Sequence, residues 1–172
     1  MNISILFALG SMLAGAFADL IYKWVQNRGI DSATFVFYQS ATFTIIIWII
    51  AKIFGYTLGI TPTTWYYGLP LGMLAYVGIV LFVTSLKHGN ASINAPIFRL
   101  SFVITSILAF VLLNESITPF KAVGILLAVV AVLSLADLSL FTKSGSQRYS
   151  LLYVLVAMCT MGVMATFSKE AM

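Results

Sequence analysis

The sequence predicts an all-α integral membrane protein, an antiparallel bundle of six transmembrane helices. Of its 172 residues, 61% are hydrophobic and only 8% are charged, and the mean hydropathy is +1.05. A soluble domain carries about 25% charged residues, so this chain has too few charges to cover a surface in water. Its apolar segments are continuous and do not alternate with period two, which favours helices over a β-barrel.

Six apolar segments are long enough to cross a hydrocarbon core of about 30 Å as helices. The predicted helices are Ile3–Tyr22, Ala33–Phe54, Thr64–Leu86, Ile93–Leu113, Phe120–Leu140 and Ser150–Phe167. The first segment could instead be a signal peptide, with a small-residue cleavage site before Asp19. No Lys or Arg precedes it, however, and the apolar run continues through Tyr22, so we expect a retained first helix.

A short polar hinge, Asn114–Ser116, joins the fourth and fifth segments and makes them antiparallel neighbours. Thr118 is a suitable N-cap, and Pro119 follows at the first helical position, where its missing N–H costs nothing. Glu115 is interpreted as a hinge residue, because carboxylates favour helix N-termini. Pro96 is expected to bend the fourth helix.

Small residues recur at a spacing of four on three segments, and we interpret them as helix-packing positions. In lipid, helices associate through close backbone approach at such residues. They are Gly10, Ala14 and Ala18 on the first segment, Gly68 and Gly72 on the third, and Gly124 and Ala128 on the fifth.

Several kinds of chemistry are not expected. With one cysteine, Cys159, and one histidine, His88, the chain cannot form an internal disulfide or a His/Cys metal site. It has no Ser/His/Asp constellation and no phosphate-binding GxxxxGK[ST] loop. No basic patch interleaved with aromatic residues indicates nucleic-acid binding. We therefore expect no catalytic residue, no metal and no cofactor.

Polar side chains gather in one half of the membrane thickness if the six helices alternate in direction. The candidate substrate-binding residues are Asp19, Tyr38, Gln39, Asn94 and Arg99. Ionisable groups inside a membrane usually face a cavity or the bundle interior, which indicates a polar vestibule. Arg99 could pair with Asp19 or Asp137, or extend to the interface, and Asp19 could instead pair with Lys23.

The sixth segment repeats features of the first. When Lys23 is aligned with Lys169, Leu6, Leu9 and Met12 coincide with Leu152, Leu155 and Met158. We therefore predict one five-helix repeat over residues 1–141, a linker over 142–149, and the first helix of a second, incomplete repeat over 150–172. An odd number of helices inverts the second copy, and inverted repeats are common in secondary transporters.

The segment from His88 to Leu135 resembles the second half of an EamA-type repeat of the drug/metabolite transporter superfamily. The matching features are the turn Asn90-Ala91-Ser92, Pro96, the hinge Asn114–Thr118 and the following helix with Gly124. The resemblance implies a ten-helix transporter of two inverted halves. The chain ends after the sixth predicted helix, so we expect a fragment, a truncated product, or a half that pairs with another chain.

The function expected from these features is secondary transport of small metabolites or drug-like molecules by alternating access. The alternative is a non-transporting membrane assembly partner or regulator, and a membrane-embedded enzyme is the least favoured reading. The expected partners are the lipid bilayer, a small-molecule substrate, and a second chain or C-terminal half that completes the inverted repeat. The expected location is the cell membrane.

The orientation of the chain stays open. Basic residues predominate at the face to which the first helix leads, which by the positive-inside rule puts the N-terminus outside. The resemblance implies an N-terminus in the cytoplasm, and we favour that orientation.

Overall fold

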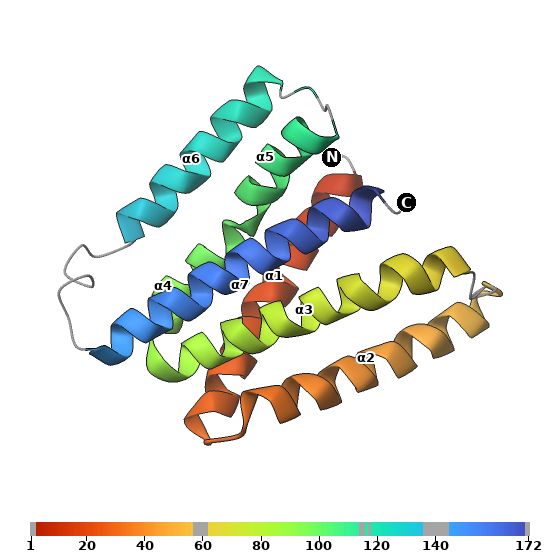
Figure 1. Ribbon diagram of the computed structural model, residues 1–172, viewed down its shortest axis with the longest axis horizontal. Helices are drawn as coiled ribbons and strands as arrows, with labels where there is room; N and C mark the ends of the chain where they lie inside the picture. The colour runs from red at the N-terminus through yellow and green to blue at the C-terminus, as the bar shows by residue number, and fades with distance from the viewer. Residues whose placement is uncertain (1–2, 57–61, 114–115, 117, 136–144, 171–172) are drawn as a thin grey trace.

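The structure, a computed structural model, describes residues 3–56, 62–113, 116, 118–135 and 145–170. All regular structure within these ranges is helical, which confirms the predicted all-α class. The helices are α1 (Ile3–Asn27), α2 (Ser32–Ile53), α3 (Pro62–His88), α4 (Ala91–Arg99), α5 (Ser101–Leu112), α6 (Pro119–Leu135) and α7 (Gly145–Glu170), as Figure 1 shows.

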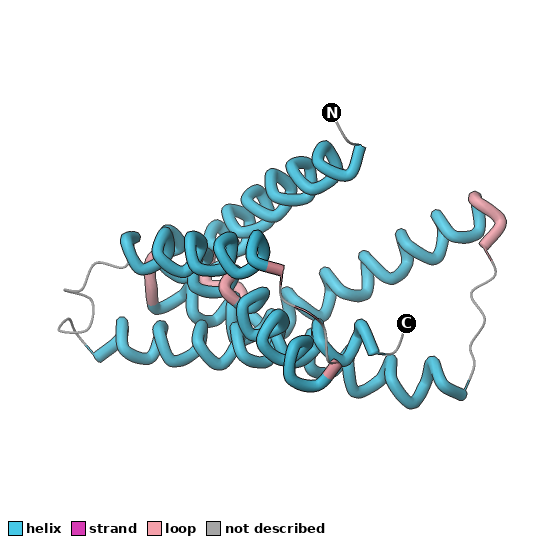
Figure 2. Tube along the Cα trace, turned by 90° about the horizontal axis from the view of Figure 1, so that it is seen from above, coloured by secondary structure: helices cyan, strands magenta, loops and turns pink. Residues whose placement is uncertain are grey.

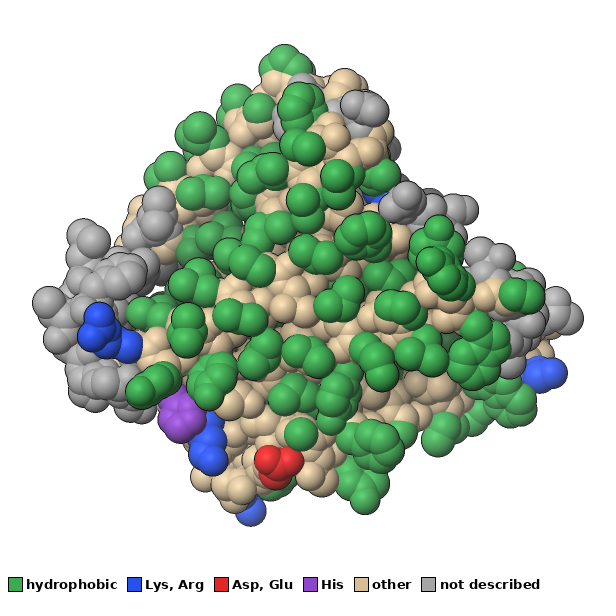
Figure 3. Space-filling model, in the orientation of Figure 1, with side chains coloured by type: hydrophobic (Ala, Val, Ile, Leu, Met, Phe, Trp, Pro, Cys, Tyr) green, Lys and Arg blue, Asp and Glu red, His purple; other side chains and the backbone are tan. Residues whose placement is uncertain are grey.

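Four segments of the described chain are long and apolar enough to cross a membrane. They are Ser32–Ile53, Thr64–His88, Ala91–Leu112 and Gln147–Lys169, and Pro119–Val132 is a shorter apolar helix. Hydrophobic side chains cover the face of the molecule seen in Figure 3, while charged side chains lie near its margins. Large residues such as Phe7, Phe43 and Phe120 are exposed, as a surface that contacts lipid requires.

Helices α3 and α7 form the centre of the bundle and pack against each other more extensively than any other pair. Helices α1 and α2 pack on α3, whereas α4 and α5 pack on α7 (Figure 1). The buried centre of this arrangement contains Phe82, Leu86, Val154 and Ala157. The ring of Phe82 stacks on Phe98 of α4 at a centroid distance of 4.1 Å, so the core also fixes α4.

The N-terminal end of α1 stands away from the other helices, as the view in Figure 2 shows. Large residues along this part of α1, including Phe7, Met12 and Phe17, are exposed. The C-terminal end of the same helix is buried instead, at Val25 and Gln26. Helix α1 is therefore buried at its C-terminal end and exposed along its N-terminal part.

Two predicted helix boundaries were wrong. Helix α1 continues to Asn27, beyond the predicted end at Tyr22, and α7 begins at Gly145, ahead of the predicted start at Ser150. Part of the predicted linker 142–149 is therefore helical. Apolar residues mark the hydrocarbon depth, but a helix continues into polar sequence as long as its backbone hydrogen bonds can form.

The predicted fourth helix is interrupted. Helices α4 and α5 are separated at Leu100, whose N–H donates to the carbonyl of Ile97 at 3.0 Å, the tighter three-residue bond. The N–H of Val103 donates in the same way to the Leu100 carbonyl at 2.9 Å. The expected bend is thus a break at Leu100, one turn after Pro96, which itself has no N–H to donate.

The helix start predicted at Thr118 and Pro119 is confirmed. Pro119 is the first residue of α6, and the Thr118 hydroxyl accepts a 3.4 Å hydrogen bond from the backbone N–H of Lys121. Glu115, predicted as a hinge residue, lies outside the described residues.

The packing contacts predicted for several glycines are not found among the described residues. A Cβ atom added at Gly10, Gly68, Gly72 or Gly124 would meet no described neighbour within 4 Å. Close approach occurs at Gly15, Gly78, Gly89 and Gly162 instead. Four-residue spacing places small residues on one face of a helix, but it does not decide whether another helix lies against that face.

Candidate functional site

The centre of the candidate site is an ion pair between α1 and α4. Nη2 of Arg99 lies 2.9 Å from Oδ2 of Asp19, one of the pairings that the sequence allowed. The side chain of Arg99 is 53% exposed and that of Asp19 only 14% exposed. Asp137, the other candidate partner, lies outside the described residues.

A glycine lets the arginine lie across α1. A Cβ atom added at Gly15 would sit 2.9 Å from Nη2 and 3.3 Å from Cζ of Arg99. Any side chain at this position would therefore displace the guanidinium. Gly15 is one turn before Asp19 on α1, so the helix supplies both the partner of Arg99 and the space for it.

The ion pair lines an open groove of about 470 Å³ between α1 and the α4–α5 segment. Its other lining residues are Met12, Ala16, Ala95, Pro96 and Phe102. Small-molecule sites typically measure about 300–1,000 Å³ and combine apolar walls with a few polar groups. The groove fits that description in size and in composition.

Two predicted site residues lie elsewhere. Tyr38 and Gln39 belong to α2 and line a separate open groove with Phe35 and Thr42. Nε2 of Gln39 donates a 2.7 Å hydrogen bond to the hydroxyl of Tyr22, which ties α2 to α1. Oε1 of Gln39 is buried and accepts no hydrogen bond within the described part of the chain. The structure therefore does not bring Tyr38 and Gln39 to Arg99.

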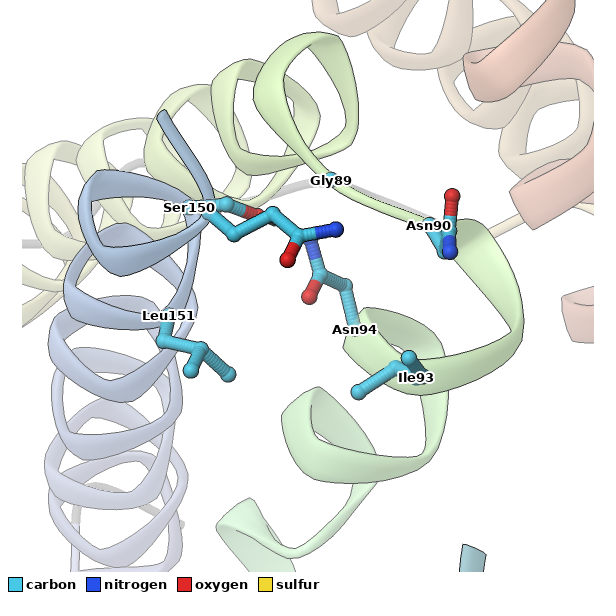
Figure 4. Close-up of a pocket in the computed structure, with 7 residues that line it drawn as sticks. Gly89, Asn90, Ile93, Asn94, Ser150 and Leu151 are labelled. Atoms are coloured by element: carbon cyan, nitrogen blue, oxygen red, sulfur yellow. Dashed lines mark hydrogen bonds between the residues drawn. The ribbon is translucent and has the colours of Figure 1, made fainter. Parts of the chain in front are cut away.

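Asn94, the remaining predicted site residue, is 2% exposed and lies in a polar junction of α3, α4 and α7 (Figure 4). Its Nδ2 atom donates to the Ser85 carbonyl at 3.0 Å and to Oγ of Ser150 at 2.7 Å. Beside it, Gly89 and Gln147 help to line a cavity of about 10 Å³. That volume suits about one water molecule. Asn94 therefore has a structural role in this junction, and it does not line the Arg99 groove.

Lys23 has a role that sequence reasoning missed. Its Nζ atom donates to the carbonyl oxygens of Leu86 at 2.7 Å and Gly89 at 3.0 Å. These carbonyls lie at the C-terminal end of α3, where the helix dipole attracts a cation. Lys23 therefore caps α3 from α1. The basic residue at a helix end was visible in the sequence, but its target on another helix was not.

The described residues contain no group of three or more His, Cys, Asp or Glu side chains that could hold a metal ion. A model of the EamA-like transporter family matches residues 2–136 of the chain, which spans α1 to α6. No curated protein and no solved structure gives a significant match.

Proposed function

The chain belongs to the EamA-like transporter family, and we propose that it forms the substrate path of a secondary transporter. In this proposal it moves small metabolites or drug-like molecules across the cell membrane by alternating access. The observation that carries the proposal is the half-exposed Arg99, paired with Asp19 in an otherwise apolar groove.

The cost of placing a charge within the membrane supports this role. A charge within the membrane is costly and commonly marks the path of a substrate or ion. The Arg99–Asp19 pair joins α1 to α4, and within the described part of the chain the Arg99 side chain remains 53% exposed. The exposed side of this pair faces a groove large enough for a solute.

The arrangement of α1 supports alternating access. The C-terminal end of α1 is fixed by Lys23 and by buried Val25, while its N-terminal end stands apart from the bundle. Movement of α1 relative to α4 would open or close the groove around Arg99. In inverted-repeat transporters such movements expose a central site to each side in turn.

The proposal includes a second, inverted half, supplied by further helices or by another chain. The likeness between residues 6–23 and 152–169 motivates it, since it makes α7 the first helix of that half. Co-expression of this chain with helices that complete the repeat should raise transport above the level of the chain alone.

The test is solute flux in proteoliposomes that contain the full chain. A panel of radiolabelled carboxylates, amines and neutral aromatic solutes should reveal saturable uptake. Arg99→Gln and Asp19→Asn should lower that uptake at least about tenfold, a change of about 1.4 kcal/mol in the transport barrier. The matched control is Lys52→Gln, because Lys52 lies at the end of α2 over the Trp48 ring and outside the groove.

Equal uptake by the wild type and both groove variants would remove Arg99 and Asp19 from the mechanism. If neither this chain nor the completed repeat carries flux, and crosslinking finds one stable membrane partner, the chain is an assembly partner and not a transporter.

A further inference from the structure

We propose that the groove selects an organic anion, a molecule with a carboxylate-type head and an apolar body. This inference rests on the proposed function, because it names the substrate class of the same groove. The observations that carry it are the unequal exposure of the two charges, the unused donors of Arg99, and the apolar walls.

The two charges of the ion pair differ in their exposure. Arg99 is 53% exposed, whereas Asp19 is 14% exposed, and both side chains line the groove. The groove therefore presents more of its positive charge than of its negative charge to a solute. An ammonium group that pairs with the Asp19 carboxylate would lie beside the Arg99 guanidinium, and like charges at that distance repel each other.

The guanidinium keeps most of its hydrogen-bonding capacity. An arginine side chain has five N–H donors in a planar fork. Within the described residues, its hydrogen bond is the one from Nη2 to Oδ2 of Asp19. The remaining donors can bind two oxygens of a carboxylate or another planar oxyanion at once, which is the geometry that arginine favours.

The walls of the groove suit an apolar body. Met12 of α1 faces Ala95, Pro96 and Phe102 of the α4–α5 segment across the groove. These side chains offer no hydrogen-bonding groups, so a sugar or polyol would lose its hydration without replacement. An aromatic or aliphatic body would instead bury apolar surface favourably.

Asp19 keeps the binding weak enough for release. The carboxylate neutralises part of the Arg99 charge before any solute arrives. A transported molecule must leave the site as well as enter it, so a paired cation suits transport better than a free one. Removal of the Asp19 charge should consequently tighten anion binding.

The experiment measures binding, independently of flux, with the full chain in nanodiscs of neutral phosphatidylcholine. Three probes share one body and differ in the head: 3-phenylpropionate, 3-phenylpropanol and 3-phenylpropylamine. Titration calorimetry should show the carboxylate binding at least about tenfold more tightly than the alcohol or the amine.

Four variants test the assignment. Arg99→Gln should abolish the preference for the carboxylate, and Arg99→Lys should weaken it, because lysine keeps the charge but lacks the planar fork. Asp19→Asn should tighten carboxylate binding several-fold. Lys52→Gln should leave all three affinities unchanged, since Lys52 lies outside the groove.

Equal affinities for the three probes, or binding of none, would overturn the inference, as would a carboxylate preference that survives in Arg99→Gln. If Arg99→Gln fails to fold, Asp19→Asn decides: unchanged carboxylate affinity overturns the inference. Anion binding without flux would leave this inference standing and refute the transport proposal. Flux of both amines and carboxylates, bound with equal affinity, would overturn this inference and leave the transport proposal standing.

Discussion

The side chain of Asn94 on α4 donates a 2.7 Å hydrogen bond to the hydroxyl of Ser150 on α7. That hydroxyl in turn donates to the carbonyl of Ser85 on α3 at 2.9 Å. Asn94 and Ser150 are 2% and 1% exposed. The three residues therefore join three helices through polar contacts in the buried part of the bundle.

Replacement of Asn94 by Ala should destabilise the bundle. The change removes the donor to the Ser150 hydroxyl and one donor to the Ser85 carbonyl, which still accepts from Ser150, at a cost of about 1–3 kcal/mol. Thermal unfolding in detergent measures the effect. The control is Asn90→Ala, because Asn90 is exposed and its side chain forms no capping hydrogen bond. Equal melting temperatures for the two variants would contradict a structural role for Asn94.

Two glycines should respond to alanine in opposite ways. A methyl group at Gly89 would collide with Oγ of Ser150 and lie 2.8 Å from Nδ2 of Asn94. Gly89→Ala should therefore destabilise the fold by about 1–3 kcal/mol. Gly124 has no described neighbour within 4 Å, so Gly124→Ala should stabilise α6 by about 0.5–1 kcal/mol. Unfolding of both variants under the same conditions gives the comparison, and destabilisation by both would show that Gly124 is closely packed after all.

Lys23→Met should loosen α1 from α3. The variant keeps an unbranched side chain of similar length but loses two hydrogen bonds to the Leu86 and Gly89 carbonyls. Bonds to charged groups contribute about 1.5–3 kcal/mol. Hydrogen exchange should rise in the last turn of α3, near Gly89, more than at the N-terminal turn of the same helix. Uniform exchange along α3 would argue against a capping role.

The helix cap formed by Asp31 should make the stability of the fold depend on pH. It caps α2, and hydrogen bonds from the Thr34 backbone N–H and then the Thr34 hydroxyl hold the pKa of the Asp31 carboxyl below its usual value of 3.8. Because the folded pKa is the lower one, the stabilisation is present above pH 3.8 and is lost as the pH falls through the folded pKa. Asp31→Asn keeps a capping oxygen without this titration. The stability difference between wild type and variant should thus shrink in acid, and a constant difference would refute the assignment.

Sequence patterns were sufficient for the fold class and for the start of α6. Long apolar runs imply helices in lipid, and Thr118 followed by Pro119 marks a helix start through local chemistry alone. The ends of α1 and α7 escaped prediction because hydropathy does not report where backbone hydrogen bonding stops. The break at Leu100 escaped it as well, since it follows Pro96 by a turn and carries no sequence mark of its own.

The site was only partly predictable. Arg99 and Asp19 were identified because charges are rare in apolar segments, and the structure pairs them. Tyr38, Gln39 and Asn94 have similar depth in the predicted helices, yet they face other neighbours. The depth of a residue in the membrane follows from its position along the helix. The neighbours that its side chain faces depend on how the helix is rotated about its axis, which tertiary packing decides. The close approach of Arg99 to Gly15 depends on that rotation too.

The position of α7 has a consequence for the order in which the protein matures. Ser85 and Asn94 are synthesised and inserted well before Ser150, yet both make buried contacts with it. Until α7 leaves the ribosome and enters the bilayer, Asn94 can already donate to the Ser85 carbonyl, but the hydrogen bonds that both residues make with Ser150 are missing. The earlier helices thus form an unfinished surface, and the arrival of α7 is the step that completes it.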